Sequence, residues 1–222
     1  MMRDRHQHRA RRRYWQRGDE PEFGRLINFS DAVYAIALTL LALDLRVVDL
    51  QGDVDSPAVM WAALDDLVPQ LVAFAVGFLL IAQYWLAHHD FISRLQAFDG
   101  RLMGLNLAYL GFVAVLPFPT SMIGEYEANP VSAVVFAVAL AAVSLAETLL
   151  LVHAHRAGLL RVQVSEPMHR WEVSASLQPA VMFLVTIPIA FIDPTAMLLS
   201  WLVLGFLLSK VLRRFQPPEA AA

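Results

Sequence analysis

The chain has 222 residues, of which 58% are hydrophobic, carries a formal net charge of −3 and has a mean hydropathy of +0.52. An average soluble domain is only roughly 45–50% apolar, so this composition excludes an ordinary soluble protein. The chain has no cysteine, which excludes a disulfide framework and a thiolate metal site. It also has no glycine-rich nucleotide-binding loop, and we expect neither a cofactor nor a nucleic-acid partner.

The apolar residues gather into segments that are long enough to cross a membrane. A crossing helix needs about 20 mostly apolar residues, and six segments qualify: Arg25–Val47, Leu67–His88, Arg101–Ile123, Val131–His153, Trp171–Ile192 and Pro194–Leu212. We therefore expect an all-α membrane protein with six transmembrane helices. Pro179 and Pro188 fall inside the fifth segment, where a proline removes a helix hydrogen bond, so we expect that helix to bend.

These segments define one membrane domain with a short tail at each end. We expect residues 1–24 to form a basic N-terminal tail, residues 25–214 the six-helix domain and residues 215–222 a short C-terminal tail. The first apolar segment lacks a small-residue cleavage site and is therefore expected to be retained as a span. The arginines of the N-terminal tail either bind anionic membrane lipid or act only as a topology signal.

The basic residues lie almost entirely on one side of the predicted membrane. Lysine and arginine collect on the cytoplasmic side of membrane proteins, and only Arg46 falls on the opposite side here. The other basic residues are Arg3, Arg5, Arg9, Arg11, Arg12, Arg13, Arg17, Arg25, Arg94, Arg101, Arg156, Arg161, Arg170, Lys210, Arg213 and Arg214. The opposite connections carry Asp49, Asp53, Asp55, Asp65, Asp66, Glu125, Glu127 and Asp193. We therefore predict a multi-pass protein of the cell (plasma) membrane with both termini in the cytoplasm.

The first predicted helix combines an apolar stripe with one buried carboxylate. At about 100° per residue, Ile36, Thr39 and Leu43 share one stripe, and Asp31 points about 140° away from Ile36. The periodicity does not decide whether this stripe faces lipid, a packed core or a pore.

Asp31 needs a partner, because an unpaired carboxylate within a membrane costs at least ~2.5–3.5 kcal/mol. The candidate donors at matching depth on other helices are Tyr84, Trp85, His88, His89 and Asn106. The cluster is either a purely structural hydrogen-bond network or a proton sensor that uses histidine, whose ordinary pKa is about 6.5.

The motif around Asp31 resembles the signature of a known channel family. Arg25-x-x-x-Phe29-Ser30-Asp31, followed by Ala35-Ile36 and Thr39-Leu40, is similar to the signature of the transmembrane-protein-175 family of potassium channels. The likeness continues through Tyr84-Trp85-x-x-His88-His89, the Asn106 region and Leu116-Pro117-Phe118-Pro119-Thr120. A single Phe-Ser-Asp motif resembles the prokaryotic form, which has one six-helix repeat in each chain.

The resemblance implies a homotetramer whose pore is lined by the first helix of each subunit. It makes Ile36 the hydrophobic constriction, with Thr39 and Leu43 as the next rings toward the extracellular side. It also implies a signature polar network composed of Arg25, Phe29, Ser30, Asp31, Trp85, His88 and Asn106.

A hydrophobic ring requires a different selectivity mechanism from a carbonyl-lined filter. No Thr-Val-Gly-Tyr-Gly stretch is present, so we expect the Ile36 ring to strip water from ions and to gate by dewetting. Potassium loses its hydration water at a lower cost than sodium, which predicts a leak-type, modestly selective channel. Its permeating ions are K⁺ and other monovalent cations, and we expect no other metal.

Two other classes of function remain as alternatives. Asp31, Glu147 and the prolines of the fifth segment would suit a proton-coupled secondary transporter, but no internal repeat is visible. A membrane enzyme needs convergent catalytic groups at one depth, and we find no such set, so we predict that the chain is not an enzyme.

The remaining polar candidates each have two interpretations. Glu147 is either a relay for protons or ions, or a carboxylate that is hydrogen-bonded between helices or reaches toward the cytoplasmic interface. His153, His155 and His169 form either a metal site or part of a solvated loop.

Overall fold

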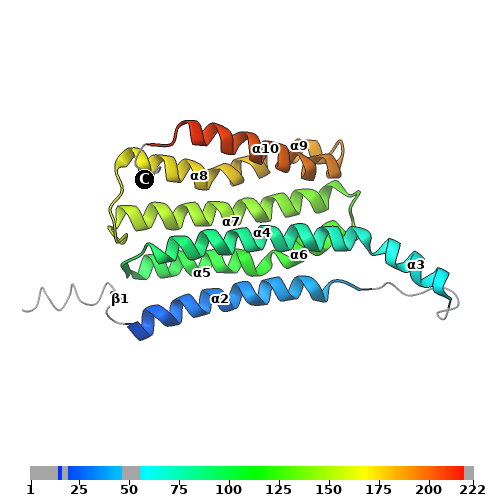
Figure 1. Ribbon diagram of the computed structural model, residues 1–222, viewed down its shortest axis with the longest axis horizontal. Helices are drawn as coiled ribbons and strands as arrows, with labels where there is room; N and C mark the ends of the chain where they lie inside the picture. The colour runs from blue at the N-terminus through cyan, green and yellow to red at the C-terminus, as the bar shows by residue number, and fades with distance from the viewer. Residues whose placement is uncertain (1–14, 17–19, 47–55, 218–222) are drawn as a thin grey trace, which may run out of the picture.

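The computed structural model describes residues 15–16, 20–46 and 56–217, which form a bundle of long helices (Figure 1). The arginines at positions 3 to 17, the acidic residues Asp49, Asp53 and Asp55, and the last residues of the C-terminal tail lie outside the described residues.

Within the described residues, six helical segments are long and apolar enough to cross a membrane, as predicted. Four of them are single helices: α2 (Glu20–Leu43), α4 (Val68–Ser93), α7 (Pro130–Arg156) and α10 (Pro194–Arg214). The other two crossings consist of α5 (Gly100–Val115) with α6 (Pro117–Glu125), and α8 (Glu166–Val185) with α9 (Ile187–Ala190). The first helix begins at Glu20, inside the stretch predicted as tail, rather than at Arg25.

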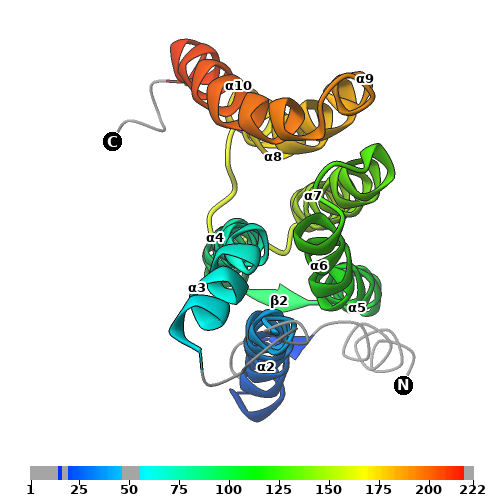
Figure 2. The ribbon, with the colours of Figure 1, turned by 90° about the vertical axis from the view of Figure 1, so that its right-hand side faces the viewer.

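The helices lie side by side with α2 at one edge of the bundle and α10 at the opposite edge (Figures 1 and 2). α2 packs against α4, α5 and α6, and α7 in the middle of the bundle packs against α5, α6 and α8. α10 packs chiefly against α8 and α9. The first helix therefore keeps one long face free of contacts with the other described helices.

Two crossings are broken next to prolines. The third is interrupted at Leu116, directly before Pro117, and the fifth at Thr186, just before Pro188, whereas α8 continues through Pro179. Proline removes a backbone donor and so leaves a carbonyl without its helix partner. The Thr186 hydroxyl donates to the carbonyl of Met182 at 3.0 Å and also to that of Phe183. The expected bend of the fifth span thus lies at Thr186.

Three short elements were not predicted from the sequence. α3 (Pro57–Asp66) precedes α4, and β1 (Trp15–Gln16) pairs antiparallel with β2 (Ala97–Phe98) in the α4–α5 connection. The same connection contacts the α7–α8 connection, because the amide of Gln96 donates to the carbonyl of Leu159 at 2.9 Å. These backbone bonds tie the entry of α2 to the other connections at this end.

Close packing of α4 on α6 depends on small residues. A Cβ at Gly77 would lie 2.5 Å from Cγ2 of Thr120, and a Cβ at Gly124 would lie 3.0 Å from Cα of Gln70. Small residues at such positions allow membrane helices to approach closely. The outer half of α2 then rests on this tightly packed pair, through Ala37 and Leu41.

Candidate functional site

α2 has one buried face and one exposed face. The buried side chains recur every three to four residues and are Phe23, Leu26, Ser30, Tyr34, Ala37 and Leu41. On the opposite face the exposed fraction is 58% for Ile36 and 66% for Leu43, and Thr39 is exposed between them. The three residues predicted to line a pore therefore share the free face of the helix.

Thr39 is oriented by its own helix. Its hydroxyl donates to the carbonyl of Ile36 at 2.9 Å. Because a hydroxyl has one donor and two acceptor lone pairs, this bond leaves the oxygen able to accept from water or to coordinate a cation.

Asp31 receives a hydrogen bond from the second crossing. The indole Nε1 of Trp85 donates to Oδ1 of Asp31 at 3.0 Å, and both side chains are half-buried. The structure thus brings together two residues that the sequence placed at matching depth. This bond supplies part of the stabilisation that a carboxylate in an apolar helix requires.

Ser30 links the first and third crossings. Its hydroxyl donates to the carbonyl of Leu26 at 3.1 Å and accepts from Nδ2 of Asn106 at 3.3 Å. Ser30 and Asn106 are both buried, and each thereby satisfies part of the other's hydrogen-bonding capacity.

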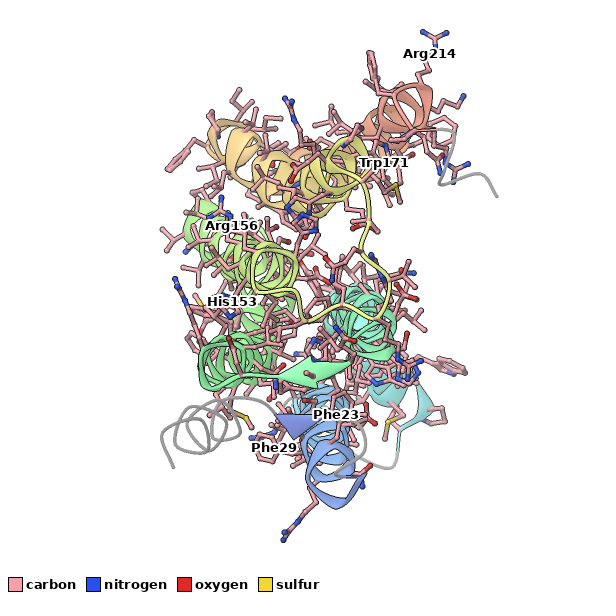
Figure 3. The ribbon with its side chains drawn as sticks, turned by 90° about the vertical axis from the view of Figure 1, so that its left-hand side faces the viewer. Phe23, Phe29, His153, Arg156, Trp171 and Arg214 are labelled. Atoms are coloured by element: carbon pink, nitrogen blue, oxygen red, sulfur yellow. The ribbon has the colours of Figure 1, made fainter. Side chains whose placement is uncertain are left out.

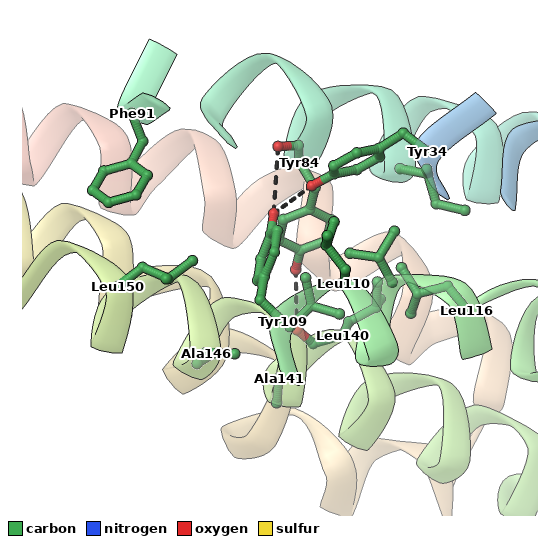
Figure 4. Close-up of a cluster of buried hydrophobic side chains, with 14 of the residues drawn as sticks. Tyr34, Tyr84, Phe91, Tyr109, Leu110, Leu116, Leu140, Ala141, Ala146 and Leu150 are labelled. Carbon is green, nitrogen blue, oxygen red and sulfur yellow. Dashed lines mark hydrogen bonds between the residues drawn. The ribbon is translucent and has the colours of Figure 1, made fainter. Parts of the chain in front are cut away.

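A chain of tyrosines continues this polar contact into the bundle (Figure 4). The hydroxyls of Tyr34 and Tyr109 are 2.5 Å apart, and that of Tyr109 donates to the carbonyl of Tyr84 at 3.5 Å. The Tyr84 hydroxyl in turn lies 3.0 Å from the carbonyl of Leu140 and 2.7 Å from the hydroxyl of Ser144. Hydrogen bonds thus connect α2 with α5, α4 and α7.

Sequence reasoning missed Tyr34 and Tyr109, although a signal was present. Tyr34 lies one turn after Ser30 and Tyr109 one turn after Asn106, so each shares a face with a residue of the predicted network. The contact between Ser30 and Asn106 is thus followed, one turn later on both helices, by the contact between Tyr34 and Tyr109.

Three residues of the predicted network, His88, Arg25 and Phe29, take no part in the hydrogen bonds of Asp31 and Ser30. His88 is buried and stacks on Tyr109 with 4.8 Å between ring centroids, and neither of its ring nitrogens has a hydrogen-bond partner among the described residues. Arg25 and Phe29 are exposed, and Arg25 forms no ion pair with a residue that the structure describes.

The remaining candidates also have defined positions. Glu147 is half-buried in α7 and forms no side-chain hydrogen bond within the described ranges. His155 stacks on His169 with 3.6 Å between ring centroids. Nowhere in the described residues do three potential ligands converge on a metal site.

His153 lies on a helix and pairs with Asp99, rather than forming part of a solvated loop. Its Nε2 is 3.0 Å from both carboxylate oxygens of Asp99, which also accepts from the amide of Leu102 at 2.7 Å and so caps α5. Burial opposes the charged form of Asp99, but the bonds from Leu102 and His153 outweigh it and lower the pKa of Asp99.

Known proteins resemble the chain over most of its length. The family model described as endosomal/lysosomal potassium channel TMEM175 matches residues 25–117. A potassium channel of Streptomyces collinus is 41% identical over 143 residues, which cover 63% of this chain and 68% of that protein. A potassium channel of Chamaesiphon minutus is 33% identical over 165 residues, covering 71% of this chain and 76% of the relative.

A solved structure confirms the fold. The crystal structure of a lysosomal potassium-selective channel TMEM175 homolog from Chamaesiphon minutus superposes with a TM-score of 0.66 at 28% identity. The match covers 88% of this chain and 99% of that one. With six apolar crossings and these relatives, the chain is a multi-pass membrane protein that belongs to the TMEM175 family, a family of ion channels rather than enzymes.

Proposed function

We propose that the chain is one subunit of a homotetrameric, potassium-permeable channel whose pore is lined by α2 of each copy. Relatives that share its family are potassium channels by name. The observation that carries the proposal is the free face of α2, on which Ile36, Thr39 and Leu43 follow one another while the opposite face is buried.

The free face of α2 is suited to a self-association interface. Exposed apolar residues of a membrane helix contact either lipid or another helix, and α2 is the crossing at one edge of the bundle (Figure 2). Its inner half is fixed from behind by the Asp31–Trp85 and Tyr34–Tyr109 contacts. A helix fixed on one face presents its other face in a constant orientation, as a pore wall requires.

In this proposal the ring of Ile36 side chains is the constriction. A narrow apolar ring offers no ligand to replace hydration water, so it dewets and restricts ion passage. K⁺ passes more readily than Na⁺ because it gives up its water at a lower cost. The Thr39 hydroxyl, which is held by the Ile36 carbonyl, then offers oxygen to the partly dehydrated ion.

We further propose that both termini lie in the cytoplasm and that the protein resides in the plasma membrane. The support is the collection of described basic residues at the end where α2 begins, where Arg156 and Arg214 also lie (Figure 3). Such residues gather on the cytoplasmic side.

Flux into proteoliposomes tests the channel proposal. We expect the purified protein to pass K⁺ faster than Na⁺ without a coupled ion, and Ile36→Asn to bring the two rates close together. The matched control is Leu202→Asn, since Leu202 is 73% exposed on α10, the helix at the edge opposite α2. Unchanged selectivity in Ile36→Asn, or an equal effect of Leu202→Asn, would contradict the assignment.

The same flux assay distinguishes a channel from a proton-coupled secondary transporter. Flux that saturates at carrier rates, and that stops when a proton gradient is collapsed, would indicate proton-coupled transport instead of a channel.

A further inference from the structure

Two histidines stack face to face where α7 ends and α8 begins. The rings of His155 and His169 are 3.6 Å apart between centroids and only 7° from parallel. Nδ1 of each ring is buried without a hydrogen-bond partner among the described residues, and the same is true of Oε2 of Glu172, one turn after His169. Buried polar atoms are normally paired. These three atoms therefore leave the cluster with unused capacity to bind protons.

The charged groups that face the stack are nearly balanced. Glu166 lies with its Oε1 3.7 Å from Nε2 of His155, and Glu172 acts on His169 from the same helix. Glu172 is already paired with Arg94 of α4 at 2.6 Å. The side chain of Glu166 is 80% exposed, so water screens its charge. Arg156 adds a further positive charge, so little negative charge is left to offset protons on the histidines.

A second proton on the stack would place two like charges in contact. One charged imidazole can stack on a neutral one, whereas two charged rings at this separation repel each other strongly in a partly buried site. Interacting groups of this kind take up their protons in two separate steps. The second step favours a structure in which the rings have moved apart, because a ligand shifts the population toward the conformation that binds it better.

The connection between the two histidines is tied to the entry of α2. The amide of Gln96 donates to the carbonyl of Leu159, and the amide of Arg161 donates to the carbonyl of Arg94, both at 2.9 Å. An isolated antiparallel bridge joins the same two connections. β2 follows directly after Gln96 and pairs with β1, which precedes α2. Backbone bonds thus link the α7–α8 connection, through β2 and β1, to the start of the first helix.

We propose that His155 and His169 form a proton-operated latch at the end of the bundle where α2 begins. With at most one ring charged, the stack holds the start of α8 against the end of α7. When both rings are protonated, the stack opens and the α7–α8 connection moves away from the α4–α5 connection. Acid on this side of the membrane thereby loosens the backbone bonds that anchor β1 and the entry of α2.

The geometry of the pair favours protons over a metal ion. The lone pair of an imidazole nitrogen lies in the plane of its ring, so two parallel rings do not direct their lone pairs to one point. A metal site also needs further ligands, and no group of three potential ligands converges in the part of the chain that the structure describes.

The test measures the opening of the latch in the full-length protein. Because the chain has no cysteine, Ser93→Cys and Val162→Cys provide two unique sites for spin labels. Both positions are exposed, at the end of α4 and in the α7–α8 connection. We expect the label separation to widen between about pH 7.5 and about pH 5, a range that spans the ordinary histidine pKa of about 6.5. An unchanged separation would overturn the proposal.

Phenylalanine variants identify the groups that take up the protons. His155→Phe and His169→Phe each keep a flat ring in the stack but remove one proton site, so the label separation no longer changes with pH. His89→Phe is the matched control, because His89 is exposed at the same end of the bundle and packs on Trp85 instead. It keeps the wild-type response. A response that persists in His155→Phe and His169→Phe, or that is lost equally in His89→Phe, would contradict the latch.

The consequence for conduction rests on the proposed channel function and is measured separately. We expect K⁺ flux into proteoliposomes to fall over the same pH range, because a loosened anchor lets α2 leave the orientation that a pore wall requires. The fall is smaller in His155→Phe. An equal fall in His155→Phe and wild type would overturn the link from the latch to α2. The label separation needs no ion flux, so failure of the latch and failure of the channel proposal are distinguishable.

Discussion

The indole of Trp85 donates a hydrogen bond to the carboxylate of Asp31 across 3.0 Å, and this bond joins α4 to α2 inside the predicted membrane region. An acceptor at this depth has few alternative donors, so the bond has both a structural and an electrostatic role. Removing the indole donor would leave the half-buried carboxylate of Asp31 without its hydrogen-bond partner among the described residues.

We expect Trp85→Phe to lower the free energy of unfolding by about 1–2 kcal/mol, because it removes the donor and keeps most of the ring. The check is thermal unfolding in detergent alongside K⁺ flux. Asp31→Asn retains an oxygen acceptor and is expected to be milder. Trp61→Phe is the matched control, since Trp61 is 69% exposed on α3; a comparable loss there would contradict the role given to Trp85.

Gly77 is expected to tolerate no side chain. In Gly77→Ala the new Cβ would lie 2.5 Å from Cγ2 of Thr120, and Thr120 cannot rotate freely because its hydroxyl donates to the Leu116 carbonyl at 2.8 Å. Overpacking of this kind costs about 1–3 kcal/mol, measurable as a lower unfolding midpoint.

Two further variants test that explanation of the Gly77 effect. Adding Thr120→Ser removes the clashing methyl group but keeps the hydroxyl, so it is expected to restore part of the stability. Gly111→Ala has no atom within 4 Å of its new Cβ and is expected to be neutral or to stabilise the helix by up to about 1 kcal/mol. A loss in Gly111→Ala as large as in Gly77→Ala would point to a general effect of replacing glycine.

Asp99 predicts an acid-dependent loss of stability. Burial disfavours its charge, but the hydrogen bonds from Leu102 and His153 prevail and hold the pKa of Asp99 below its usual value in the folded state. The contribution of Asp99 to the free energy of unfolding is therefore fully present above its pKa in the unfolded state, which is about 3.9. This contribution is lost as the pH falls through the lower pKa that Asp99 has in the folded state.

The measurement compares the wild type with Asp99→Asn between about pH 6 and pH 3. We expect the stability advantage of the wild type to be constant down to about pH 4 and to shrink below it. Asp90→Asn serves as a control at an exposed carboxylate of the same end of the bundle. An advantage of Asp99 over Asn that does not change with pH would contradict this account.

The crossings were predictable because a membrane requires long apolar helices, and hydropathy alone locates them. Depth placed Trp85 among the candidate partners of Asp31, since Asp31 follows the start of α2 and Trp85 precedes the end of α4 at the same end of the bundle. Depth could not decide among several donors, however. His88 sits at a matching depth but stacks on Tyr109 instead, because its direction around the helix depends on how α4 packs.

The tyrosine contacts and the short strands were not predicted, for different reasons. Tyr34 and Tyr109 recur with the same period as the apolar core residues, so their hydroxyls do not stand out in a hydropathy pattern. β1 and β2 have two residues each, too few for any alternation to be visible. His153 and its partner Asp99 are 54 positions apart in the sequence, and only the fold brings them together.

The two halves of α2 are held by different kinds of force. The inner half is tied by directional hydrogen bonds at Ser30, Asp31 and Tyr34, and β1 pairs with β2 just before it. Among the described residues, the outer half makes no hydrogen bond to another helix and is retained by the apolar contacts of Ala37 and Leu41. The position of Ile36, Thr39 and Leu43 relative to the rest of the bundle is therefore set by the shape of packed side chains rather than by directional bonds.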